Sequence, residues 1–103
     1  MAQFDVYQHK QGKNTLLLVD VQSHLLSDLE TRIVIPLIPL SQAKAERATR
    51  LKPVLNLSGQ DYVLLTTDMS AQLKSNCGEL LFNIEHPHRD TIINAIDFLI
   101  LGF

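Results

Sequence analysis

The chain has 103 residues, of which 46% are hydrophobic, and its formal net charge is −2 at pH 7. This length predicts one domain, residues 1–103, with enough apolar side chains to build a core. Proteins that bind nucleic acid through its phosphates usually carry a basic stripe, whereas the nine Lys and Arg residues here are scattered. We therefore expect no direct contact with nucleic acid.

The chain carries one cysteine, Cys77, which cannot form an internal disulfide, so the predicted fold does not depend on oxidation. The first residues turn polar at once, unlike a signal peptide. The longest apolar runs are far shorter than the roughly 20 residues needed to cross a bilayer. We expect a cytoplasmic protein without membrane contact.

Alternation of apolar and polar residues predicts an N-terminal hairpin. Residues 4–7 form its first strand, residues 11–14 give a turn signal, and residues 15–21 form the second strand. The centre of that second strand is apolar on both faces, so it should be covered on both sides. Residues 23–31 follow as a long loop that carries exposed leucines.

A β-branched run at residues 33–35 predicts a third strand. Pro36 and Pro39 cannot donate a backbone hydrogen bond, so we expect a sheet edge or a sharp bend there instead of a continuous central strand. Residues 41–50 are compatible with a short helix or a mobile loop.

A second hairpin is predicted from two apolar runs, residues 53–57 and 62–66, that flank turn residues at 58–61. One more short strand is expected within residues 68–78. Residues 80–82 form an apolar patch before the last element.

The C-terminal segment is the clearest helix. Pro87 suits a first helical turn, Asp90 complements the helix dipole, and Gly102 ends the helix. One face is apolar and another is polar, as in an amphipathic helix. The apolar face comprises Ile92, Ala95, Ile96 and Leu99, widened by Ile93 and Ile100, and the polar face comprises Asp90, Asn94 and Asp97.

In order and over nearly the whole chain, these segments resemble the CcdB family of gyrase-poisoning toxins. The matching segments are FDVY at 4–7, LVDVQS at 18–23, RIVIPL at 32–37, PVL at 53–55, TTDM at 66–69, IINAI at 92–96 and the glycine before the last residue. The resemblance implies a mainly β fold with one C-terminal α-helix: a small, partly open β-barrel of the Src-homology-3 kind, as in CcdB and MazF toxins. It also implies a homodimer.

The resemblance implies a toxin of a type II toxin–antitoxin system that acts in plasmid maintenance. Such a toxin binds the A subunit of DNA gyrase and traps the enzyme on cleaved DNA, as a topoisomerase poison and not as an enzyme. A CcdA-like antitoxin with a disordered C-terminal tail neutralises it. We accordingly expect no catalytic residue, no metal and no cofactor.

Site residues follow from the resemblance as well. The family's gyrase-contacting C-terminal tripeptide falls on Leu101, Gly102 and Phe103, two loop aliphatics fall on Leu25 and Leu26, and a late polar helix residue falls on Asp97. The best-known members carry tryptophan in place of Leu101 and isoleucine in place of Phe103. For the dimer seam, the candidates are Met69, Ile96, Leu99 and Ile100.

Structural explanations compete with these roles. The terminal residues can pack on their own domain, the loop leucines can form a small satellite cluster, Asp97 can be part of a solvated helix face, and the helix can be sunk into its own barrel. The histidine spacing, His86 and His88 with His9 and His24, is a weak metal signal, and Cys77 lacks an activating motif.

Two other functions remain open. Related toxins on this kind of barrel cut messenger RNA, so an endoribonuclease is the first alternative; that chemistry needs a general base, an acid and cationic groups around a phosphate. The second is a family member that still folds, dimerises and binds its antitoxin but no longer poisons gyrase, which the leucine at position 101 keeps open.

Overall fold

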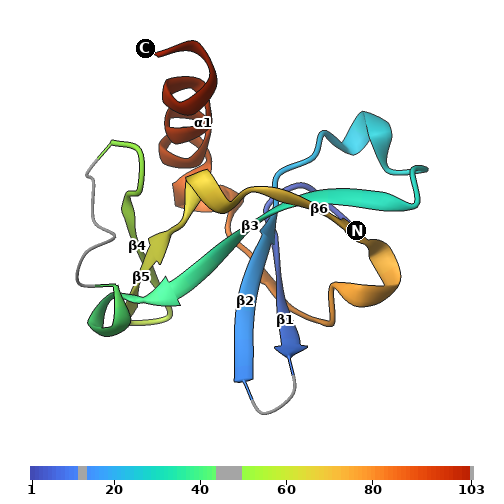
Figure 1. The fold of residues 1–103 in the computed structure, drawn as a ribbon, viewed down its shortest axis with the longest axis horizontal. Coiled ribbons are helices and arrows are strands. Elements are labelled where there is room, and N and C mark those ends of the chain that lie inside the picture. The colour runs from blue at the N-terminus through green and yellow to red at the C-terminus, as the bar shows by residue number, and fades with distance from the viewer. Residues whose placement is uncertain (12–13, 44–49, 103) are drawn as a thin grey trace.

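The computed structural model describes residues 1–11, 14–43 and 50–102 (Figure 1). The described residues form seven strands, one α-helix and four short 3-10 helices. The strands are β1 (Asp5–Gln11), β2 (Asn14–Asp20), β3 (Thr31–Pro39), β4 (Val54–Leu57), β5 (Gln60–Leu64), β6 (Ser70–Leu73) and β7 (Glu79–Asn83). The helices are η1 (His24–Leu26), η2 (Leu40–Gln42), η3 (Thr66–Asp68), η4 (Lys74–Asn76) and α1 (Glu85–Leu101).

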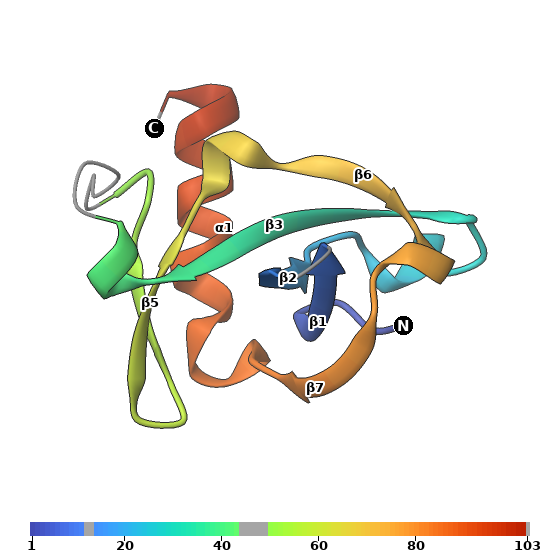
Figure 2. The same cartoon turned by 60° about the horizontal axis from the view of Figure 1, so that its bottom comes forward.

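The strands form one antiparallel sheet that curls into a half-barrel, with α1 beside it (Figures 1 and 2). Its order is β4-β5-β3-β2-β1-β7, and β6 pairs with the other part of β3. The predicted mainly β fold with one C-terminal helix is therefore confirmed. No helix within the described ranges is long and apolar enough to cross a membrane.

The N-terminal hairpin is confirmed: β1 and β2 pair from Val6 opposite Val19 to Gln11 opposite Asn14. Residues 12 and 13 of its expected turn lie outside the described residues. The second hairpin, β4–β5, is confirmed too. Ser58 and Gly59 between its strands have φ values of 54° and 86°, the positive pair that a tight turn between twisted strands requires.

The bend or edge expected at the prolines is wrong, because β3 runs unbroken from Thr31 to Pro39 and lies inside the sheet. On one side β3 pairs with β2. On the other, β6 pairs with residues 31–34 and β5 with residues 37–39. Pro36 pairs with Leu18 of β2 on the first side, and on the second it lies in the gap between β6 and β5, where its carbonyl accepts a hydrogen bond from Leu65 N–H at 2.9 Å. The missing donor therefore costs the sheet no ladder bond.

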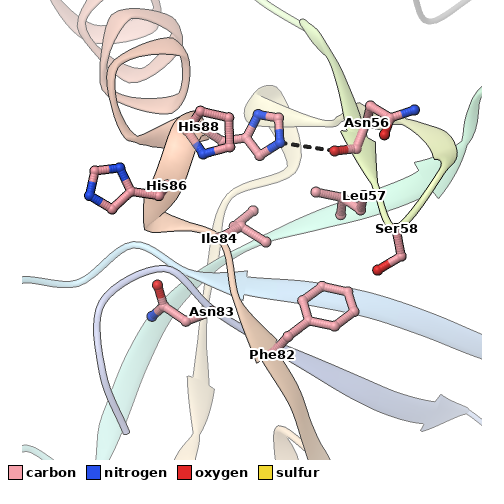
Figure 3. Close-up of a pocket in the computed structure, with 9 residues that line it drawn as sticks. Asn56, Leu57, Ser58, Phe82, Asn83, Ile84, His86 and His88 are labelled. Atoms are coloured by element: carbon pink, nitrogen blue, oxygen red, sulfur yellow. Dashed lines mark hydrogen bonds between the residues drawn. The ribbon is translucent and has the colours of Figure 1, made fainter.

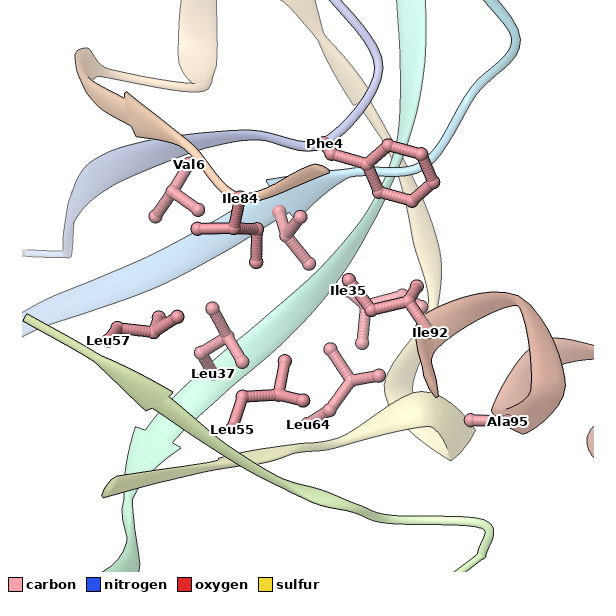
Figure 4. Packing of buried hydrophobic residues seen from close by; sticks show 11 residues of the cluster. Phe4, Val6, Ile35, Leu37, Leu55, Leu57, Leu64, Ile84, Ile92 and Ala95 are labelled. Atoms are coloured by element: carbon pink, nitrogen blue, oxygen red, sulfur yellow. The ribbon is translucent and has the colours of Figure 1, made fainter. Parts of the chain in front are cut away.

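The core fills the concave side of the sheet (Figure 4). Strands β1 to β5 and the start of the chain contribute apolar side chains, and α1 closes the cluster with Ile92 and Ala95, both fully buried. The cluster comprises Phe4, Val6, Val19, Ile35, Leu37, Leu55, Leu57, Leu64, Ile84, Ile92 and Ala95.

The predicted helix is confirmed, but its start differs from the prediction. His86 and Pro87 have non-helical backbone angles and are joined by a cis peptide bond, so Pro87 precedes the regular helix instead of filling its first turn. Residues 80–82, expected as an apolar patch, lie in β7, which pairs with β1. Of the expected helix or loop at 41–50, residues 44–49 lie outside the described residues.

Candidate functional site

The last turn of α1 projects from the body of the protein (Figure 1). Its apolar side chains are exposed. Leu99 is 37% exposed, Ile100 66% and Leu101 58%. Gly102 ends the helix at φ 81°, where its N–H donates to the Phe98 carbonyl at 3.1 Å. A left-handed residue at this position favours glycine. We call Leu101 and Gly102 the helix tip; Leu99 and Ile100 precede it and belong to the expected dimer seam, and Phe103 lies outside the described residues.

A second apolar surface lies on the loop between β2 and β3. Leu25 is 82% exposed, Leu26 50% and Leu29 49%, so they do not form a cluster folded under the loop. The 3-10 helix η1 is capped by Ser23, whose hydroxyl accepts from Leu25 N–H at 3.2 Å. The expected exposed leucines are therefore confirmed, and they sit on a turn with defined geometry.

A buried ion pair lies beneath this loop. Arg32 and Asp20 are both fully buried, and the guanidinium contacts the carboxylate twice: Nε to Oδ2 at 2.7 Å and Nη2 to Oδ1 at 3.1 Å. Such two-point pairing fixes orientation as well as charge. Arg32 also donates to the Gln22 carbonyl at 3.3 Å.

Gln22 continues this network into the loop. Its side-chain amide donates to the Leu26 carbonyl at 3.0 Å and accepts from Ile33 N–H at 3.1 Å, while its own N–H donates to Asp20 Oδ1 at 3.0 Å. The exposed leucines thus sit on a loop tied to β2 and β3 by buried polar groups.

The helix tip and the loop leucines lie at well-separated places in one chain, as both views show (Figures 1 and 2). Asp97 is half-buried, one turn before the end of α1. The proposed seam residues divide in two groups. Met69 and Ile96 are half-buried and pack on the core, whereas Leu99 and Ile100 are exposed.

The histidines at the start of α1 line a hollow of about 320 Å³ together with parts of β4 and β7 (Figure 3). His88 Nε2–H donates to the Asn56 carbonyl at 2.9 Å, which ties the helix start to β4. Within the described ranges, no three His, Cys, Asp or Glu side chains are grouped so as to hold a metal ion. Here His88 serves the packing of α1.

Two ionisable groups are buried between β1, β2 and η4. Burial raises the pKa of the Cys77 thiol, with a smaller effect in the same direction from Asp20 and an opposing one from Arg32. Burial also raises the pKa of Tyr7, whose hydroxyl donates to Asp5 Oδ2 at 3.2 Å. A thiol held in its neutral form is a poor nucleophile.

Sequence reasoning missed Arg32 and Gln22 as residues that position the loop. One signal was present: Asp20 and Gln22 sit two residues apart at the end of an apolar strand, and so point to the same side. A buried carboxylate needs a partner, and Arg32 opens the next strand. Which basic residue would pair with Asp20 depended on strand register.

The protein-family comparison matches the CcdB protein family model over residues 3–102. The chain belongs to the CcdB family. Among solved structures, it is similar to an endoribonuclease in complex with its cognate antitoxin from a mycobacterial species, with a TM-score of 0.79 and 15% sequence identity. That alignment covers 100% of this chain and 96% of the other. At this identity the likeness shows a shared fold, while membership in the CcdB family indicates a toxin of a toxin–antitoxin pair.

Proposed function

We propose that this CcdB-family protein poisons bacterial DNA gyrase by binding its A subunit, and that it performs no bond-making of its own. The helix tip carries the proposal: the Leu101 side chain is 58% exposed at the end of a capped helix, where burying it against a partner would be favourable. Leu25 and Leu26 supply a second apolar contact, and Asp97 a carboxylate beside the tip for a cationic surface.

Binding of this kind concentrates in a few anchors. An exposed leucine that becomes fully buried contributes on the order of 1.5–3 kcal/mol. Leu25 and Leu101 are therefore the side chains whose truncation should weaken gyrase binding most. Phe103, the second candidate anchor next to the tip, supplies an aromatic ring that can stack on an arginine of the target.

The test compares gyrase inhibition by the full chain and by a variant lacking residues 101–103. Supercoiling and the trapping of cleaved DNA are measured with purified gyrase, and toxicity is measured in cells without antitoxin. We expect the truncated protein to keep its fold by circular dichroism and to lose both activities. Persisting growth arrest by the truncated protein would show that the tip is not the site.

Single variants sharpen this test. Leu101→Ala and Phe103→Ala should each weaken gyrase binding, whereas Leu80→Ala should not. Leu80 is a matched control because it is 54% exposed, close to the 58% of Leu101, but lies on β7. Equal losses from Leu80→Ala and Leu101→Ala would point to a nonspecific effect of removing surface leucines.

A second candidate function, RNA cleavage, is favoured by the fold shared with an endoribonuclease and by one polar hollow. His9, Lys10 and Glu79 line about 440 Å³ between β1, η4 and β7, and they supply a base, a cation and an acid. Arg32 cannot join them as a phosphate ligand, because it is buried against Asp20. RNA cutting that His9→Ala abolishes, without any effect on gyrase, would favour this function.

A further inference from the structure

A hollow of about 300 Å³ lies between α1 and the segment that leads into β4. Its lining residues are Arg50, Pro53, Thr91 and Asn94. Three of these four residues can donate hydrogen bonds, and one carries a full positive charge. None of them belongs to the helix tip or the loop leucines.

Arg50 is held in place by an aromatic ring. Its guanidinium carbon lies 4.5 Å from the centre of the Phe98 ring, one turn along α1 from Asn94. An arginine that stacks on an aromatic face keeps the N–H groups at its edge free to donate in its own plane. Among the residues that the structure describes, Arg50 has no ion-pair partner.

We propose that this hollow binds a carboxylate side chain from an acidic segment of the antitoxin. Arg50 would take both oxygens of the carboxylate, Thr91 and Asn94 would donate to the remaining lone pairs, and Pro53 would cover the methylene groups. The inference rests on the toxin–antitoxin pairing that membership in the CcdB family indicates, and not on the gyrase binding of the proposed function.

The charges around the hollow favour a carboxylate over a phosphate. Arg50 is the one cation in the lining as far as the described residues go, and Asp90 and Asp97 lie on the same helix on either side of Thr91 and Asn94. A single negative charge is tolerated better there than the double charge of a phosphate monoester. A segment anchored at this point lies about two turns of helix from Leu101, so it could run along α1 to the tip.

The test is an NMR titration of the isotope-labelled full chain with N-acetyl-glutamate methylamide. We expect saturable shifts of the Arg50 Nε–H, the Asn94 side-chain amide and the Thr91 N–H. The uncharged N-acetyl-glutamine methylamide should produce none. Arg50→Gln should weaken the glutamate compound about tenfold or more, as expected when one charged hydrogen-bond partner is lost.

Arg89→Gln is the matched control. Arg89 also lies over an aromatic ring, 5.6 Å from the centre of Phe4, but outside the hollow, so its removal should leave the titration unchanged. Absence of saturable shifts, equal shifts with the glutamine compound, or no effect of Arg50→Gln would overturn the proposal. Tighter binding of inorganic phosphate would also overturn it, in favour of a phosphate-bearing partner. Gyrase inhibition is assayed separately, so either proposal can fail while the other stands.

Discussion

Asp20 and Arg32 form a two-point ion pair beneath the loop between β2 and β3. Both are fully buried, and each satisfies charge and hydrogen bonds that the other would otherwise leave unpaired. Replacing a buried ion pair with apolar residues is often nearly neutral, but removing one partner leaves a charge without compensation. The pair therefore makes the loop geometry specific more than it makes the fold stable.

Arg32→Met should destabilise the protein by about 3–5 kcal/mol, because it leaves the Asp20 carboxylate buried without its cation. Urea unfolding followed by circular dichroism measures the change. The double variant Asp20→Leu with Arg32→Met should recover part of the loss, since no charge then remains buried. A single variant within about 1 kcal/mol of wild type would contradict the network described here.

The raised pKa of Tyr7 predicts how the free energy of unfolding changes at alkaline pH. Burial raises its pKa above the ordinary value of 10.0. As pH rises, the Tyr7 hydroxyl therefore loses its proton in the unfolded state at a lower pH than in the folded state. The resulting stability is complete below pH 10 and is lost as pH rises further, by up to about 1.4 kcal/mol per pH unit. Tyr7→Phe removes this dependence.

Urea unfolding of wild type and Tyr7→Phe at pH 8, 10 and 11 tests the argument. The stability difference between the two proteins should be constant up to about pH 10 and then narrow, as the linkage relation requires. Cys77 is present in both proteins, so its own titration contributes to both, and only its smaller effect on the pKa of Tyr7 enters the difference. A difference that stays constant through pH 11 would mean that the Tyr7 hydroxyl is not shielded as described.

At the scale of elements, the loop between β2 and β3 carries exposed leucines proposed to bind gyrase, and the buried Gln22 holds it in place. Gln22 bonds the Leu26 carbonyl and Ile33 N–H, although its own side chain is buried away from any partner surface. Gln22→Ala keeps the Leu25 and Leu26 side chains unchanged, but it removes the side-chain hydrogen bonds that hold the loop. We expect faster amide hydrogen exchange at residues 24–29 and weaker gyrase binding, with a loss of about 1–3 kcal/mol in global stability because the Ile33 N–H loses its acceptor.

Leu29→Ala provides the comparison, because it shortens an exposed leucine of the same loop without touching the Gln22 hydrogen bonds. It should leave hydrogen exchange in the loop unchanged. If Gln22→Ala weakens gyrase binding without faster exchange, the side chain acts by some route other than holding the loop.

Local patterns predicted most elements, and the exceptions have physical causes. The hairpins and α1 followed from alternation, turn residues and helical spacing, all of which act within a few residues. β3 continues through Pro36 because β6 and β5 leave a gap in their pairing opposite this residue. That gap is set by two strands distant in the sequence. β7 needed β1 as its partner, and residues 79–83 gave no sign of that pairing by themselves.

For the site, sequence predicted which leucines are exposed but not what supports them. Leu25 and Leu26 are exposed as the polar loop around them predicted, and Leu101, a gyrase contact implied by the resemblance, is exposed too. The hydrogen bond of Gln22 with Ile33 and the stacking of Arg50 on Phe98 depend instead on tertiary contacts. The partners of such groups lie 10 or more residues away or on another element. Short-range patterns carry no information about them.

At the scale of the whole molecule, the helix tip and the loop leucines of a single chain lie far from each other. The helix tip stands clear of the half-barrel, and the loop leucines lie at another end (Figures 1 and 2). A chain of 103 residues buries a modest share of its surface, and pairing with a second copy would bury more. Half-buried Met69, which follows η3, and half-buried Ile96 of α1 pack on the core, and Leu99 and Ile100 continue α1 as exposed residues. These four residues are our proposed seam.

The dimer proposal predicts that Leu99→Asp with Ile100→Asp yields a folded monomer. Two carboxylates in an apolar seam would each lose their hydration on association, whereas in the monomer both positions face solvent. Sedimentation velocity across protein concentrations measures the shift from dimer to monomer, and circular dichroism checks the fold.

Leu80→Asp, on the exposed edge strand β7, should remain dimeric. Wild-type protein that stays monomeric at every concentration, or a double variant that dimerises as wild type does, would place the seam elsewhere or remove it. Association favours the folded state more strongly at higher protein concentration. The midpoint of thermal unfolding should therefore rise with protein concentration for wild type and stay constant for the double variant.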